Sequence, residues 1–156
     1  YVEIVDHYGR HHRYSGPGLD FAGMVGKPES AWPELSYQAV HYLFPNTTFA
    51  FTHALDGKTP VVAMFRLFPG ASVGEAITLA TTYRRSDAGS VPDERVAEMH
   101  DTVLALVANE DYRIARDAWQ SLVHAPPGFR FLLGRSEALL QSYHRDIAEA
   151  IGMALS

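Results

Sequence analysis

Residues 36–69, SYQAVHYLFPNTTFAFTHALDGKTPVVAMFRLFP, carry the clearest strand pattern in the chain. This stretch contains three runs rich in β-branched and aromatic residues, which favour strands. The runs are separated by Pro45-Asn46 and by an Asp-Gly-Lys sequence at 56–58, both of which are typical of turns. A fourth run of this kind follows at residues 74–85. Because short links join neighbouring strands in opposite directions, the sequence predicts an antiparallel meander.

Upstream of the meander, residues 1–15 predict one or two short strands around Tyr8-Gly9. Residues 16–36 hold four glycines and three prolines and predict a loop that includes a short helical turn. The first residue is Tyr1 rather than Met, and it lies inside a strand-like run. We therefore expect the chain to be part of a longer protein.

Downstream of the meander, the apolar residues recur with the spacing of a helix instead of that of a strand. Pro92, followed by two acidic residues, predicts a helix start, and the pattern runs to Leu122 with a bend near Asn109. A Pro-Pro-Gly segment then precedes a last helix, for which Ser136 is the expected cap. Strands first and helices last indicate an α+β layout. The residues expected on the inner face of the last helix are Leu140, His144, Ile147 and Ile151.

The length and composition limit the possible functions. A chain of 156 residues fits one domain over residues 1–156. The net charge of −5 and the lack of a basic run argue against nucleic acid as a partner. No apolar run approaches the roughly 18–20 residues that span a membrane, and no secretory signal opens the chain. The absence of cysteine excludes an iron–sulfur cluster held by this chain and favours a cytoplasmic location.

One acidic residue falls in the apolar stripe of the predicted long helix. Asp111 follows Val107 by four residues and precedes Ala118 by seven, which places all three on one helix face. A buried carboxylate needs a partner, because leaving it unpaired is costly. Three interpretations stay open for Asp111: an ion pair with a basic residue, a helix end or kink, and a metal ligand or catalytic acid.

The histidines do not decide between these interpretations. His7 and His12 are five residues apart, a separation that metal ligands can use, although surface positions are more usual for such strand residues. His144 is expected as a hydrogen-bonded core residue. The sequence contains no nucleophile elbow, P-loop, dinucleotide fingerprint or H-E-x-x-H motif. The residues alone indicate an α+β ligand-binding or catalytic domain with one inward-facing acid.

Four segments in order nevertheless resemble one enzyme family. HYLFPNTTFAF (41–51) resembles the FPN strand in the catalytic domain of Rieske-type non-haem iron ring-hydroxylating oxygenases, and DHYGRHHRYSGPG (6–18) resembles the segment before it. NEDYRIARDAWQSL (109–122) is similar to that family's acidic pair on its long helix. LLGRSEALLQSYHRDIAEAI (132–151) is similar to its closing helix.

The resemblance implies a fold and a function. The fold would be a helix-grip, START-like domain, with an antiparallel sheet curved around a long C-terminal helix. Asp111 would be the carboxylate ligand of a mononuclear Fe(II), whose two histidine ligands would lie upstream of this chain together with a [2Fe-2S] Rieske domain. The chain would then be the C-terminal part of an oxygenase α subunit, inactive by itself, in which the iron and O₂ hydroxylate an aromatic or apolar substrate.

The resemblance also implies partners and a pocket. A reductase or ferredoxin would supply electrons, and the assembly would be a homotrimer. The substrate pocket would include Gln38, Val40 and Ala50 from the sheet, with Val107 one helical turn above Asp111. An alternative stays open, in which the same fold is a metal-free module that binds a hydrophobic ligand.

Overall fold

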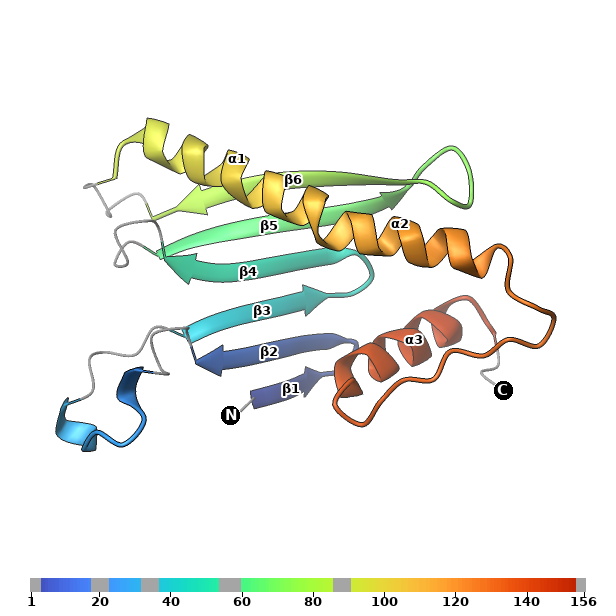
Figure 1. The fold of residues 1–156 in the computed structure, drawn as a ribbon, viewed down its shortest axis with the longest axis horizontal. Coiled ribbons are helices and arrows are strands. Elements are labelled where there is room, and N and C mark those ends of the chain that lie inside the picture. Colours follow the sequence, from blue (N-terminus) through green and yellow to red (C-terminus); the bar gives the residue numbers. More distant parts are fainter. Residues whose placement is uncertain (1–3, 18–22, 32–36, 54–59, 86–90, 154–156) are drawn as a thin grey trace.

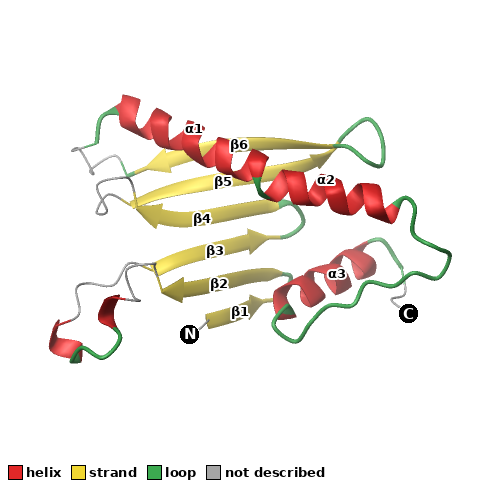
Figure 2. Cartoon of the chain, in the orientation of Figure 1, coloured by secondary structure: helices red, strands yellow, loops and turns green. Residues whose placement is uncertain are grey.

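The computed structural model describes residues 4–17, 23–31, 37–53, 60–85 and 91–153 (Figure 1). These residues form a sheet with helices on one side of it (Figures 1 and 2). The elements are β1 (Ile4–Tyr8), β2 (His11–Pro17), the 3₁₀ helix η2 (Glu29–Ala31), β3 (Tyr37–Leu43), β4 (Thr47–His53), β5 (Pro60–Pro69), β6 (Ala76–Arg84), α1 (Asp93–Asn109), α2 (Asp111–Leu122) and α3 (Ala138–Ala150).

The sheet is a six-stranded antiparallel meander in the order β1-β2-β3-β4-β5-β6. Its register places Tyr14 opposite Val40, Val40 opposite Ala50, Ala50 opposite Ala63, and Ala63 opposite Thr82. Paired residues in a sheet point to the same side, so these five positions define one face. The α+β class and the antiparallel meander predicted from the sequence are confirmed.

Helices α1 and α2 lie along this face, over the β5–β6 side (Figure 1). The Nδ1 atom of His100 on α1 is 2.9 Å from the hydroxyl oxygen of Thr82 on β6. The hydroxyl of Tyr112 on α2 donates to the hydroxyl of Thr78, 2.6 Å away on the same strand. These two polar contacts hold both helices to the sheet face that also carries Val40.

The packed centre lies between α1 and the sheet. Val61, Val91 and Met99 form a buried cluster, and Val96 packs against it. Val61 is the most completely buried large side chain among the described residues. The apolar stripe of α1 therefore faces the sheet, as the helical period predicts.

The long helix breaks where the sequence predicts a bend. Glu110 separates α1 from α2, and its backbone departs from helical geometry with φ −106° and ψ −74°. The amide of Glu110 still donates to the carbonyl of Leu106 at 2.9 Å, and the amide of Ile114 donates to the carbonyl of Glu110 at 3.0 Å. Because hydrogen bonds continue across the break, α1 and α2 act as one long bent helix.

The last helix differs from the prediction at its start. It begins at Ala138 with Glu137 at the cap position, so the capping role predicted for Ser136 is wrong. The Glu137 carboxylate instead accepts a hydrogen bond from the amide of Gly134, in the preceding turn.

The inner face of α3 also differs from the prediction. Leu140, His144 and Ile151 are exposed, whereas Ser142 and Ala148 are buried. Polar and aromatic side chains of α3, among them Asp146 and Tyr143, also contact the sheet, and a count of apolar residues does not detect them.

Gly74, in the turn between β5 and β6, lies against Trp119 of α2. A Cβ atom at this position would approach the indole Nε1 to 2.6 Å. We expect Gly74→Ala to lower the free energy of unfolding by about 1–2 kcal/mol, because the exposed Trp119 can move only partly away. Urea denaturation measures the change. Gly23→Ala is the matched control, since a Cβ there meets nothing within 4 Å, and an equal loss in both variants would contradict the prediction.

Candidate functional site

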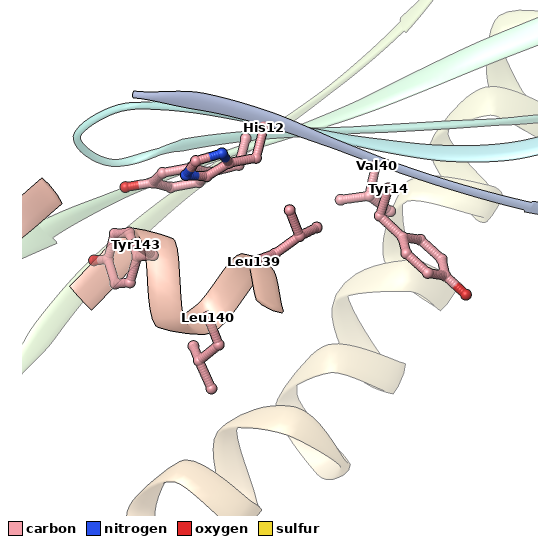
Figure 3. Close-up of a pocket in the computed structure, with 7 residues that line it drawn as sticks. His12, Tyr14, Val40, Leu139, Leu140 and Tyr143 are labelled. Carbon is pink, nitrogen blue, oxygen red and sulfur yellow. The ribbon is translucent and has the colours of Figure 1, made fainter. Parts of the chain in front are cut away.

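A pocket of about 260 Å³ lies between α3 and strands β2 and β3 (Figure 3). Its lining is almost entirely apolar and aromatic, and in Figure 3 Leu139 and Tyr143 of α3 lie across from His12 and Val40 of the sheet. An apolar pocket with aromatic walls is the usual form of a small-molecule site. The lining residues are His12, Tyr14, Val40, Tyr42, Leu139, Leu140 and Tyr143.

A largely buried contact between a histidine and a carboxylate lies beside this pocket. The Nε2 atom of His12 is 3.2 Å from the Oδ2 atom of Asp146 on α3, and the two side chains are only 3% and 19% exposed. Neither ring nitrogen of His12 has a well-aligned hydrogen-bond partner among the described residues. The contact with Asp146 is nevertheless short, and it places a carboxylate oxygen against the buried imidazole. Its removal would leave a buried polar group without a partner.

Aromatic rings surround His12. The ring of His7 meets it edge-on at 5.0 Å, and the ring of Tyr42 stacks on it at 6.0 Å between centroids. Tyr143 of α3 meets Tyr42 edge-on at 5.0 Å. Burial and the neighbouring Tyr143 raise the pKa of Tyr42 above its usual value, so this hydroxyl stays protonated and donates to the carbonyl of Pro45.

An ion pair joins α3 to the β1–β2 hairpin. The guanidinium of Arg10 lies 3.4 Å from the carboxylate of Glu149, and these side chains are 42% and 72% exposed. Solvent screens such a pair, so it contributes little to stability. Among the described residues, α3 thus makes one largely buried histidine–carboxylate contact and one exposed ion pair with the β1–β2 hairpin.

Three of the predicted pocket residues share the helix-covered face. Val40 lines the pocket, Ala50 lies opposite Val40 in the sheet, and Gln38 is two residues from Val40 on the same strand. Val107 is partly buried on α1. The three strand residues thus lie on one face of the sheet, and the role of all four residues in substrate binding stays a prediction.

Asp111 is the first residue of α2 and is exposed. The predicted burial of this carboxylate is wrong, because none of the described residues covers this turn of the helix and α2 carries no buried residue. Asp111 forms no ion pair within the described ranges, which leaves its carboxylate available. A second pocket of about 390 Å³, between α1 and β6, does not include Asp111 either.

The described residues do not by themselves form an iron site. No group of three or more histidine, aspartate or glutamate side chains lies close enough to hold a metal ion in the part of the chain that the structure describes. His7 and His12 are neighbours, but the Nε2 atom of His12 lies against Asp146. A facial triad needs two histidines and one carboxylate, and Asp111 supplies at most the carboxylate.

No sequence pattern predicts the pocket beneath α3 or the contact between His12 and Asp146. The two residues come from opposite ends of the chain, and each is unremarkable within its own segment. Only the docking of α3 on β2 and β3 brings them together.

Comparison with known proteins identifies the family. The family of ring hydroxylating α subunits (catalytic domain) matches residues 11–153, which is nearly the whole chain. The chain belongs to this family, and the resemblance seen in the four segments is confirmed. The family implies a non-haem iron in the catalytic domain and a hydroxylation reaction on aromatic substrates.

Two further comparisons give no match. No curated protein and no solved structure is significantly similar to the chain. Within the described residues, no helix is both long enough and apolar enough to cross a membrane.

Proposed function

We propose that this chain is the C-terminal part of the α subunit of a Rieske-type oxygenase, which uses mononuclear Fe(II) and O₂ to hydroxylate an aromatic or similarly apolar substrate. The observation that carries the proposal is the apolar pocket on the helix-covered face of a chain that belongs to the ring-hydroxylating family. Such a pocket binds a flat apolar ring by removing its surface from water.

Within this proposal, Asp111 is the carboxylate ligand of the iron, and the histidine ligands come from outside the described residues. Its exposed position at the start of α2 supports this role, because an available carboxylate can bind a metal ion. Gln38, Val40, Ala50 and Val107 are the proposed substrate contacts.

The proposal extends to the partners of the intact protein. A [2Fe-2S] Rieske cluster, held upstream of this chain, would receive electrons from a reductase or ferredoxin. We further propose a homotrimer in the cytoplasm. Transfer of one oxygen atom of O₂ to the substrate would define a monooxygenase, and transfer of both would define a dioxygenase.

The test is oxygen incorporation by the intact protein. We expect the protein, loaded with iron and supplied with reductase and NADH, to convert naphthalene into a hydroxylated product that carries ¹⁸O from ¹⁸O₂. Mass spectrometry of the product counts the labelled atoms. A protein with a reduced Rieske cluster and bound iron that incorporates no label into any of a panel of aromatic compounds would overturn the proposal.

A metal-free module that binds a hydrophobic ligand is the second candidate. The apolar lining of the pocket beneath α3 is compatible with it, because such a lining holds a hydrophobic ligand without a metal. The same experiment separates the two, because such a module would bind naphthalene without consuming O₂ and with no bound iron.

A further inference from the structure

We propose that Tyr112 is a positioning residue, whose hydrogen bond to Thr78 of β6 fixes the direction in which helix α2 presents the carboxylate of Asp111. The inference rests on the proposed function, since it takes Asp111 to be the iron ligand. Tyr112 does not touch the metal in this role; it acts through the residue next to it in the chain.

Helix α2 is held to the sheet differently from α1. Helix α1 enters the buried cluster through Met99, whereas α2 has no buried residue. The two helices meet at Glu110, whose backbone departs from helical geometry directly before Asp111. Backbone hydrogen bonds join the helices end to end across this break, so the contacts of α2 with the sheet decide how the second half of the bent helix lies.

Two side chains of α2 contact the β5–β6 hairpin. The hydroxyl of Tyr112 donates to the hydroxyl of Thr78 over 2.6 Å. The indole of Trp119 lies against Gly74, in the turn between the two strands. Tyr112 and Trp119 are seven residues apart, which places them on one helix face and about 10 Å apart along the axis. Helix α2 therefore rests on the hairpin through this face, and Tyr112 is the contact beside Asp111.

The helical period converts this contact into a direction for Asp111. Successive residues of a helix are turned by about 100° around its axis. Because Tyr112 faces β6, Asp111 is turned by this angle away from the strand, in agreement with its exposure. A roll of α2 about its axis would change where the carboxylate points. Groups that orient a metal ligand in this way affect metal affinity strongly, because an ion accepts its ligands from few directions.

The hydrogen bond of Tyr112 affects orientation more than stability. Tyr112 is 36% exposed, so water can replace the bond when it is lost, and its net contribution to the free energy of unfolding is small. Trp119 would still hold the far end of α2 against the hairpin. We therefore expect loss of the Tyr112 hydroxyl to leave the fold intact and to loosen the first turn of α2.

The experiment measures the dissociation constant of Fe(II) in the metal-depleted intact protein, without oxygen, by competition with a chromogenic chelator. Tyr112→Phe removes only the hydroxyl and should raise this constant about tenfold, at the lower end of the effect of residues that orient metal ligands. Thr78→Val removes the acceptor and should act alike, whereas Thr78→Ser keeps a hydroxyl and should keep the wild-type constant. Since the two side chains act through one bond, the double variant Tyr112→Phe/Thr78→Val should lose no more than either single variant.

Tyr83→Phe is the matched control. Tyr83 is an exposed tyrosine of the same strand, and it follows Thr82, which lies on the helix-covered face. Neighbouring residues of a strand point to opposite faces, so Tyr83 points away from α2. The variant should therefore keep the wild-type constant for Fe(II). Circular dichroism shows beforehand that each variant is folded.

The outcomes separate the positioning role from the proposed function. A wild-type constant in folded Tyr112→Phe, or an equal rise in Tyr112→Phe and Tyr83→Phe, overturns the inference. If Asp111→Ala loses Fe(II) in the same assay, the ligand assignment stands even then. If Asp111→Ala binds Fe(II) like the wild type, the ligand assignment and the positioning role both fail. A protein whose affinities follow the expected pattern but which hydroxylates nothing refutes the proposed function and leaves the role of Tyr112 intact.

Discussion

Asp111→Ala is expected to lower turnover by the intact oxygenase by at least about 100-fold, while the visible absorption of the Rieske cluster stays unchanged. Residues that only support metal ligands already cost about 10–100-fold in affinity or activity when replaced, so the loss of a ligand itself should exceed that range. Iron content and product formation, measured on the same preparation, check the prediction.

Asp117→Ala is the matched control for this experiment. Asp117 is an exposed acidic residue on the same helix, and it should keep full turnover when replaced. Because Asp111 is exposed as well, both variants should unfold with free energies within about 1 kcal/mol of the wild type. Wild-type turnover by Asp111→Ala would end the ligand assignment.

Asp146→Ala is expected to lower the free energy of unfolding by about 2–3 kcal/mol. Breaking a fully buried pair costs about 3–5 kcal/mol, and the partial exposure of Asp146 reduces that figure. Glu149→Ala should cost less than about 1 kcal/mol, because its pair with Arg10 is exposed. Urea denaturation of both variants gives the comparison.

A double-mutant cycle isolates the contribution of the pair. If His12 and Asp146 stabilise the fold through each other, His12→Ala in the Asp146→Ala background should cost less than His12→Ala alone. Purely additive losses, or equal losses in Asp146→Ala and Glu149→Ala, would mean that the pair does not hold α3.

The class of fold followed from the sequence because its signals are local. Turn residues such as Pro45 and Asn46 lie between strand-like runs, and short links leave an antiparallel meander as the natural arrangement. The bend near Asn109 was also visible locally, as an acidic residue that interrupts an apolar helical stripe.

The exposure of Asp111 was not predictable in this way. The place of Asp111 in the apolar stripe shows which residues share its helix face. Whether that face is buried depends on whether another helix or strand covers it. In the structure α1 supplies Met99 to the buried cluster, and α2 supplies no buried residue. The same apolar helical period thus occurs in α1, which packs on the sheet through Met99, and in α2, whose residues are mostly exposed.

The order of strands and helices, the antiparallel pairing and the four motifs of the family can be predicted from local sequence, because each depends on residues close together in the chain. The inner face of α3, the pocket beneath it and the burial of His12 against Asp146 emerge only when the chain is folded. These features depend on where α3 docks on β2 and β3. That position is set by contacts between residues from opposite ends of the chain, and no local pattern records such contacts.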